Sequence, residues 1–456
     1  MQDLTEGPIP GHLARMAVPI AVGMVFQTLY YLVDLFFVGK LGDAAIAGLA
    51  SAGNLQFLIM ALTQVLGVGT MALIAHASGR KDRDDANLVF NQSLGLAAVC
   101  AAATLVGGYA LADAYMGVLG ADAATEAAGV TYLHWFLPGL ALQFALISMG
   151  SALRGTGIVN PTIVVQVFTV GLNAVLSPIM IAGWLTGRPM GLMGAGLSTT
   201  ISVGVGVALM FVYFVRLERF VVFDPSRMAP RWAAWKRILV VGLPPGGEFA
   251  LMFVYMAVIY WAIRGFGPEA QAGFGVGSRV MQAVFLPAMA IAFAAAPVAG
   301  QNMGAGKPDR VRATFRAAVW VLSAIMVLLT LLCQVRPGVL IGFFTDDPAV
   351  VAVGVEFLRI ISINFVATGI VFTCSGLFQA MGNTLPSLVA SATRIVTFTI
   401  PAVWMSGQPW FELHHLWFTS VATVALQAAA AWWLLALEMR RRLGPPIPVA
   451  PAAVVG

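Results

Sequence analysis

Residues 25–42 read VFQTLYYLVDLFFVGKLG and place one acid, Asp34, in an apolar run that extends over 17–38. At about 1.5 Å per residue, this run is long enough to cross a bilayer as one helix. Four polar or aromatic side chains in it follow helical spacing and so share one face: Gln27, Tyr30, Tyr31 and Asp34. A carboxylate is costly in lipid, so we expect this face to point into protein or a wet cavity.

A plainer interpretation places Asp34 at the outer headgroups, paired with a neighbour such as Lys40. Lys40 follows six residues later and therefore lies off the polar face. Because acids inside membrane-spanning runs are rare, we favour a functional role for Asp34.

The composition is that of a polytopic membrane protein. The chain of 456 residues is 59% hydrophobic and only 10% charged, and its mean hydropathy is +0.88. A soluble protein of this size cannot bury so much apolar surface in one core. The net charge of +5 does not indicate a nucleic-acid partner, because the basic residues are confined to the predicted loops. The cysteines lack metal-ligand spacing and are interpreted as small buried hydrophobic residues: Cys100, Cys333 and Cys374.

Apolar windows of about 20 residues predict an all-α fold with twelve transmembrane helices. The first run is too long for the core of a cleavable signal peptide, so we expect none. The predicted spans are 14–38, 44–76, 88–112, 128–152, 160–184, 192–216, 238–263, 270–301, 312–335, 350–377, 385–407 and 413–438.

The loop charges predict the orientation. Basic residues gather in the connections after the second, fourth, sixth, eighth and twelfth spans, for example at Arg80, Lys81 and Arg83. The opposite connections hold few basic residues and several acids, among them Asp122 and Asp347. By the positive-inside rule, both termini are predicted to lie in the cytoplasm, and the protein in the cell (inner) membrane.

The two halves of the chain repeat each other. Matching residues recur at a spacing of 225 positions: Pro19 with Pro244, Gly42 with Gly267, Gly48 with Gly273, Gly79 with Gly304, Asp122 with Asp347, Gly157 with Gly382, and Pro161 with Pro386. Each half holds an even number of spans, six, so the halves are predicted to be parallel repeats. The expected domains are a first bundle over 1–215, a cytoplasmic linker over 216–237, a second bundle over 238–440 and a disordered tail over 441–456.

Glu248 is the second intramembrane acid. It lies twelve residues after Lys236, about 18 Å along a helix and hence near the midplane. The preceding residues 244–247, PPGG, are expected to weaken the helix and to free backbone carbonyls. We expect Glu248 to bind substrate or a proton; the alternative is a static brace, neutral by burial or paired with an arginine.

Small polar residues in the fifth and sixth spans are candidate cation ligands. Asn173 and Ser177 are four residues apart and share one face, and Thr199 or Thr200 follows in the next span. With Asp34 they could supply hard oxygen ligands to a small cation. The alternative for each residue is an ordinary hydrogen bond between helices.

Three arginines lie inside or near later spans, and we expect them to pair with carboxylates or helix ends: Arg279, Arg359 and Arg394. Aromatic and methionine side chains in a wet cavity would suit flat organic cations through cation–π and thioether contacts. The candidates are Tyr30, Tyr31, Met252, Phe253, Tyr255, Met256, Tyr260, Trp261, Met281 and Met289.

Several catalytic patterns are missing from the sequence. It contains no G-x-x-x-x-G-K-[ST] loop, no H-E-x-x-H and no C-x-x-C. The histidines lie at predicted loop ends, without a plausible partner serine and acid. We therefore expect a protein that is not an enzyme and that uses no cofactor beyond a coupling ion.

The chain resembles the multidrug and toxic compound extrusion (MATE) family over nearly its whole length. In the first half the resemblance rests on VDLFFVGKLGDAAIAG (33–48), ALRGTGIVNPT (152–162) and GLNAVLSP (171–178). In the second half it rests on GLPPGGEF (242–249), GFGPEAQAGFGVGSRV (265–280), VAGQNMGAGKPDRVR (298–312) and QAMGNTLPS (379–387).

The resemblance implies an outward-pumping antiporter in which two six-helix bundles flank a central cavity. Inward flow of H⁺ or Na⁺ would drive export of a cationic or amphipathic organic compound. The family's aspartate, asparagine and glutamate in helices one, five and seven fall on Asp34, Asn173 and Glu248, and a Na⁺ ion would sit at Asp34 and Asn173.

The chain departs from the family pattern at three positions. Ser177 stands where many members have a second acid, and Thr368 where one branch has an aspartate. Gln379 replaces the arginine of the second RGxG-like turn. Because a proton needs fewer ligands than Na⁺, we favour H⁺ as the coupling ion.

Two other functions agree less well with the sequence. A flippase or exporter of lipid-linked or polysaccharide precursors would be expected to line its cavity with arginines that hold phosphates, whereas the candidates here are acidic and aromatic. A membrane scaffold or receptor would not explain two intramembrane acids in a repeated architecture. The expected partners are small organic cations and the lipid bilayer, and the expected state is a monomer.

Overall fold

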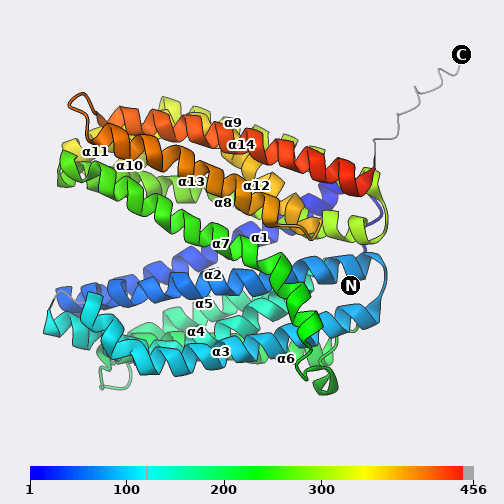
Figure 1. The fold of residues 1–456 in the computed structure, drawn as a ribbon. Coiled ribbons are helices and arrows are strands. Elements are labelled where there is room, and N and C mark those ends of the chain that lie inside the picture. Colours follow the sequence, from blue (N-terminus) through cyan, green and yellow to red (C-terminus); the bar gives the residue numbers. More distant parts are fainter. Residues whose placement is uncertain (120–121, 445–456) are drawn as a thin grey trace, which may run out of the picture. The chain divides into compact units, whose positions relative to one another are not determined.

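The computed structural model describes residues 1–119 and 122–444, apart from the side chains of 30–35, 40, 43 and 44. The described chain is all-α, and twelve of its helical segments are long and apolar enough to cross a membrane, as predicted (Figure 1). The helices are α1 Ile9–Val38, α2 Asp43–Gly79, α3 Arg83–Leu119, α4 Ala123–Gly155, α5 Asn160–Ile181, α6 Gly191–Arg216, α7 Trp232–Ile263, α8 Pro268–Gly304, α9 Pro308–Val335, α10 Pro337–Gly342, α11 Pro348–Ile361, α12 Phe365–Ala380, α13 Leu385–Ser406 and α14 Leu413–Leu443.

Two compact units make up the chain. The first comprises 1–3 and 14–250, and the second comprises 4–13 and 251–456. The prediction placed the start of the second bundle at 238, but residues 238–250 of α7 pack with the first unit. The reason is a close crossing of α2 and α7: a Cβ atom at Gly242 would lie 1.8 Å from the carbonyl oxygen of Val65. Only glycine permits backbones to approach so closely.

The sequence repeat corresponds to equivalent backbone features. Gly42 and Gly267 precede α2 and α8 with φ of 108° and 91°, a region that favours glycine. Asp122 and Asp347 cap the N-termini of α4 and α11, accepting hydrogen bonds from the backbone N–H of Thr125 at 2.7 Å and of Ala349 at 2.9 Å. These two matching pairs therefore stand at helix starts in each half.

Helix α7 runs without interruption through Pro244 and Pro245. The PPGG segment therefore does not break the helix, which continues to Ile263. Gly246 lies against the side chain of Val65 on α2, where a Cβ would come within 2.4 Å of Val65 Cγ2. Packing against α2 thus supports the helix at the point where proline removes backbone hydrogen bonds.

The tenth span, in contrast, is divided. Helices α11 and α12 are separated by the 3₁₀ turn η4, Ser362–Asn364. Side chains of α9 satisfy the carbonyls near the turn: Gln334 donates to the carbonyl oxygen of Arg359 at 2.6 Å, and Thr330 donates to that of Ser362 at 2.9 Å. A backbone break at membrane depth requires such partners.

Large aromatic side chains fill both units. In the first unit Phe90 of α3 stacks on Phe214 of α6 with ring centroids 4.6 Å apart. In the second unit Trp417 of α14 stacks on Phe274 of α8 at 5.7 Å and meets Phe357 of α11 edge-on.

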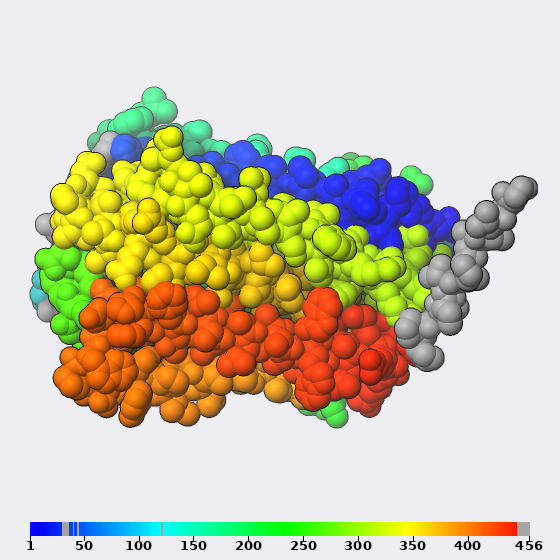
Figure 2. Space-filling view, turned by 90° about the horizontal axis from the view of Figure 1, so that it is seen from above, coloured from blue at the N-terminus to red at the C-terminus, as the bar shows by residue number. Residues whose placement is uncertain are grey.

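Figure 2 shows α13 and α14, in orange and red, forming a continuous surface of the second unit. Exposed tryptophan and leucine side chains lie on α14, as expected for a helix in contact with lipid.

The C-terminal tail begins later than predicted. Helix α14 continues to Leu443, whereas the tail was expected to begin at 441. Arg442 in its last turn donates to the carbonyl oxygen of Met381 at 2.7 Å and pairs with Glu438 at 2.5 Å. These contacts hold the last turn against the end of α12. The rest of the predicted tail, 445–456, lies outside the described residues.

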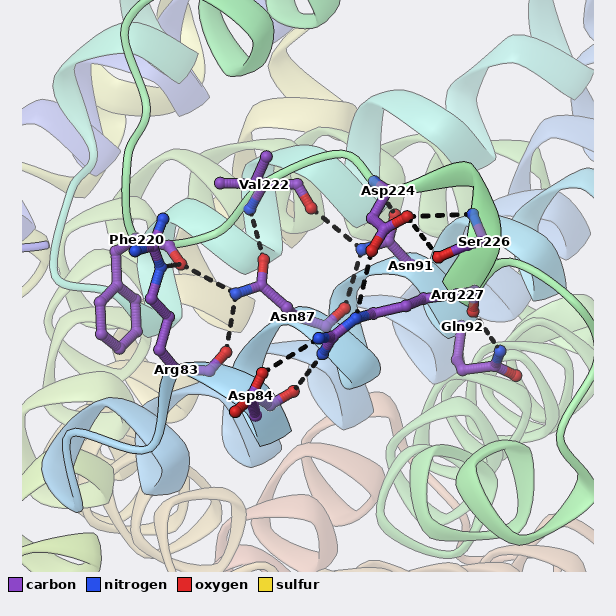
Figure 3. Close-up of polar contacts among 10 residues, drawn as sticks. All are labelled: Arg83, Asp84, Asn87, Asn91, Gln92, Phe220, Val222, Asp224, Ser226 and Arg227. Carbon is purple, nitrogen blue, oxygen red and sulfur yellow. Dashed lines mark hydrogen bonds and ion pairs between the residues drawn. The ribbon is translucent and has the colours of Figure 1, made fainter.

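Three amide side chains of α3 hold the segment that joins α6 to α7 (Figure 3). Asn87 donates to the carbonyl oxygen of Phe220 and accepts from the N–H of Val222. Asn91 donates to the carbonyl oxygen of Val222 and accepts from the N–H of Asp224. These four hydrogen bonds are 2.6–3.1 Å long. Gln92 donates to the carbonyl oxygens of Arg227 and Ala229 and accepts from the N–H of Arg231. Residues 220–231 are therefore bound as an edge strand would be, by side chains instead of a neighbouring strand.

Asp224 forms the turn in the middle of this linker. Its carboxylate accepts from the N–H and the hydroxyl of Ser226, at 3.0 and 2.6 Å, and pairs with Arg227 at 3.2 Å. The hydroxyl of Ser226, and less strongly the guanidinium of Arg227, hold the pKa of Asp224 below its ordinary value. The turn is therefore charged and intact at neutral pH.

Replacing Asn91 should release the linker. Asn91→Ala removes the partners of the part-buried carbonyl of Val222 and the part-buried N–H of Asp224, at a cost of up to about 1–3 kcal/mol each. We expect trypsin to cleave the purified variant after Arg227 or Arg231 about tenfold faster than the wild type. Asn160→Ala, at an exposed asparagine, is the control. An unchanged cleavage rate for Asn91→Ala would show that these hydrogen bonds do not hold the linker.

Candidate functional site

Buried polar side chains meet between α5 and α6 inside the first unit. Asn173 and Ser177 of α5 and Ser198 of α6 are fully buried, and Thr199 is nearly so. The hydroxyl of Ser177 lies 3.4 Å from Asn173 Oδ1 and 3.4 Å from the hydroxyl of Ser198. Ser198 and Thr199 also donate to the carbonyl oxygen of Ala195, at 3.0 and 3.1 Å. We call Asn173, Ser177, Ser198 and Thr199 the α5–α6 cluster.

Helix spacing and a glycine contact bring the cluster together. Asn173 and Ser177 are one turn apart on α5, so both point the same way. Gly194 of α6 lies against the end of α5, where a Cβ would come within 2.6 Å of the Met180 backbone. This approach lets the short side chains of α6 reach those of α5.

The cluster offers oxygen ligands and no charge of its own. Three hydroxyl groups and one amide oxygen can accept hydrogen bonds or coordinate a small hard cation. Among the described residues there is no group of three or more histidine, cysteine, aspartate or glutamate side chains that could hold a metal ion. A bound cation would therefore depend on a carboxylate close to the cluster. The expected carboxylate, Asp34, has a side chain outside the described residues, as do Tyr30 and Tyr31.

Thr200 does not belong to the cluster. Its hydroxyl donates to the carbonyl oxygen of Trp135 at 2.6 Å and accepts from the N–H of Gly139 at 3.1 Å. In a regular helix those two groups of α4 would pair with each other, and Pro138 lies directly between them in the chain. Thr200 therefore fills an opening in the hydrogen-bond ladder of α4, so of the two candidate threonines only Thr199 remains.

The other predicted residues are more open. Glu248, Tyr255 and Met281 are partly buried, whereas Gln27 and Met252 are exposed, Met252 by 50%. Glu248 lies within the part of α7 that belongs to the first unit, and Met252 and Tyr255 lie in the part that belongs to the second. The assignment of these residues to substrate or proton binding stays a prediction.

Sequence reasoning missed two features. Ser198 joins the cluster, although its position one residue before Thr199 and 21 after Ser177 carries no signal on its own. Arg394 was expected to pair with a carboxylate or helix end. Instead its guanidinium lies over the ring of Tyr255, 4.1 Å from the ring centroid. Such contacts between distant segments depend on how α7 and α13 pack.

Comparison with known sequences identifies a family. The MatE family model matches residues 19–179 and again 244–405, so the two matches begin 225 residues apart, at the spacing of the internal repeat. A relative from Bacillus subtilis (strain 168), named "Probable multidrug resistance protein YpnP", is 26% identical over 417 residues, which cover 91% of this chain and 90% of the relative. A relative from Thermotoga maritima, named "Probable multidrug resistance protein NorM", is 26% identical over 427 residues and is covered equally well.

A solved structure shares the fold. A MOP superfamily transporter from Pyrococcus furiosus superposes with a TM-score of 0.89 at 23% identity, over 96% of this chain and 98% of that one. It is described as having a binding pocket of reverse polarity that suggests a different function.

The role of Thr200 can be tested by removing its hydroxyl. Thr200→Val leaves the α4 carbonyl and N–H without partners at about 1–3 kcal/mol each, so thermal unfolding in detergent should begin several degrees lower. Thr131→Val is the control, because Thr131 is exposed and bonds only within its own helix turn. Equal melting of the two variants would contradict this assignment.

Proposed function

Since this chain belongs to the MatE family, whose members are transporters and not enzymes, we propose that it exports cationic or amphipathic organic compounds in exchange for H⁺ or Na⁺. The observation that carries the proposal is the double family match at the repeat spacing, on a chain with twelve membrane-spanning helices. The relatives named for multidrug resistance support the class of cargo. Transport would proceed by alternating access.

In this proposal Asp34 and the α5–α6 cluster couple the ion. Asp34 supplies the titratable charge. Asn173, Ser177 and Thr199 supply neutral oxygens and are held in a buried part of the first unit. Burial favours the protonated acid, while hydrogen bonds to the carboxylate favour its charged form. A group balanced in this way can take up a proton in one conformation and release it in another.

We favour H⁺ over Na⁺ on the composition of the cluster. Na⁺ would need several oxygen ligands around it, and apart from Asp34 the proposed ligands are neutral. A proton needs only the carboxylate and one or two hydrogen-bond partners. If Na⁺ is used, its ligands are Asp34 and Asn173.

Substrate recognition is assigned to the aromatic, thioether and acidic candidates. Tyr255 and Met281 are partly buried and Met252 is exposed. Together they offer an aromatic ring and flexible thioether side chains to a flat cargo molecule. Glu248 supplies a negative charge for an organic cation or a proton. Gln27, Tyr30 and Tyr31 complete the set on α1. Exchange follows if cargo and coupling ion favour different conformations, because a ligand shifts an equilibrium only by its differential affinity.

The topology proposal places both termini and the linker in the cytoplasm. Ser226 in the linker and Thr186 between α5 and α6 are both exposed. In a variant whose three native cysteines are replaced by alanine, a membrane-impermeant maleimide applied to intact cells should label Thr186→Cys and spare Ser226→Cys. Labelling of Ser226→Cys alone would reverse the orientation. Permeabilised cells, in which both should react, are the control.

The coupling role is tested with Asp34→Asn, which keeps the size and hydrogen bonding of the side chain but removes its titratable charge. Gradient-driven uptake of a cationic dye into everted vesicles should fall by about tenfold or more, in line with the usual range of coupling energies. Expression should be normal, because removing a charge from a membrane helix relieves a cost. H⁺ and Na⁺ gradients are imposed one at a time, so the same assay identifies the ion.

Asp113→Asn, at an exposed acid near the end of α3, is the matched control and should transport normally. Full-rate transport by Asp34→Asn under both gradients would exclude Asp34 as the coupling residue. If the wild type transports the dye under neither gradient, the proposed function itself fails.

A further inference from the structure

Arg394 lies in the middle of α13, on the face that packs inside the second unit. It is the tenth residue of a 22-residue helix, close to the midpoint of a membrane span. Buried residues recur one to three turns away on the same face: Ser387, Ala390, Phe398, Ala402 and Met405. Exposed apolar residues occupy the opposite face: Val389, Val396, Ile400 and Val403. The arginine therefore points into protein rather than into lipid.

Its immediate surroundings are aromatic and fixed. The guanidinium lies 4.1 Å from the centroid of the Tyr255 ring, on the part of α7 that belongs to the second unit. Tyr255 is itself held by a 2.7 Å hydrogen bond between its hydroxyl and that of Ser420 on α14, and by the ring of Phe398 at 4.8 Å. One face of the guanidinium is thereby occupied, while its N–H groups lie in the plane of the group and are not used by this contact.

No anion among the described residues meets that edge. Across the described residues, Arg394 makes no ion pair within 4.0 Å and its side chain makes no hydrogen bond. Its Nε is fully buried without a partner. Two other arginines, in contrast, pair with acids: Arg237 binds Asp85 at 2.8 Å, and Arg312 binds Asp309 at 3.0 Å. Leaving a charge unpaired inside a membrane domain is costly, and the ring of Tyr255 compensates only part of that cost.

We propose that Arg394, stacked on Tyr255, is a subsite for the carboxylate of an exported aromatic compound. A carboxylate can bind the N–H edge of a guanidinium through two parallel hydrogen bonds, while Tyr255 and Phe398 offer apolar surface to an aromatic body. The subsite rests on the proposed export function. It extends the cargo from organic cations to anionic and zwitterionic aromatic molecules.

The experiment compares two dyes that differ by one charge. Tetramethylrhodamine carries a free carboxylate, and its methyl ester does not; binding of each to the purified full-length protein in detergent is followed by fluorescence polarisation. Arg394→Gln should weaken binding of the acid about tenfold or more and change binding of the ester less than about twofold. Arg394→Lys keeps the charge but lacks the planar guanidinium, so its affinity for the acid should lie between those of the wild type and Arg394→Gln.

Two further variants separate the subsite from general effects. Tyr255→Leu removes the supporting ring and should weaken binding of the acid more than binding of the ester. Arg279→Gln is the matched control: Arg279 is an exposed arginine on α8, and its removal should change neither dye. Equal weakening of both dyes by Arg394→Gln would indicate a structural or long-range charge role and overturn the subsite. No change for either dye would also overturn it.

A competition measurement covers the case in which Arg394→Gln does not fold. On the wild-type protein, 2-naphthoate should displace tetramethylrhodamine and 2-naphthamide at the same concentration should not; equal displacement would contradict the subsite. The export proposal is judged separately, by gradient-driven transport of the methyl ester in vesicles. Transport of the ester together with no binding of the acid would overturn the subsite and leave the export proposal standing.

Discussion

The absence of water in the hydrocarbon core of a bilayer is the constraint on which the rest of this structure depends. Every backbone N–H and C=O within a span must find a partner inside the protein, which restricts the described chain to helices. Where proline or a turn interrupts the ladder, another element repairs it. Thr200 bridges the two groups separated by Pro138 of α4, and Gln334 and Thr330 serve the carbonyls around η4. Polar side chains of this kind are structural, although they resemble binding residues in the sequence.

The same constraint draws attention to buried polar side chains that do not replace a lost backbone hydrogen bond. The α5–α6 cluster gathers an amide and three hydroxyls in a fully packed part of the first unit. Arg394 keeps a cation on the packed face of α13 without an anion among the described residues. Both arrangements cost free energy that folding alone does not require. We propose that the first acts on the coupling ion together with Asp34, and that the second binds a carboxylate of the cargo.

Outside the membrane spans the chain uses amide side chains to fix irregular backbone. Asn87, Asn91 and Gln92 give the linker the hydrogen bonds that a neighbouring strand would give. The linker and residues 238–250 of α7 therefore both belong to the first unit. Beyond residue 14, the chain passes from the first unit to the second inside α7, between Ala250 and Leu251, and not in the polar linker. The close contact of Gly242 with Val65 is the physical reason.

The sequence by itself determined the fold class, the twelve spans and the repeat, because these follow from apolar length and from residues that start helices wherever they occur, such as Gly42 and Asp122 with their partners Gly267 and Asp347. It also singled out Asn173 and Ser177 by helical spacing, with Thr199 or Thr200 in the next span. Only the tertiary structure decided that Thr200 serves α4, that Ser198 joins the cluster, that α7 continues through Pro244 and Pro245, and that Arg394 stacks on Tyr255. Those outcomes depend on which helices meet and at what distance, and contacts between residues far apart in the chain leave no local pattern in the sequence.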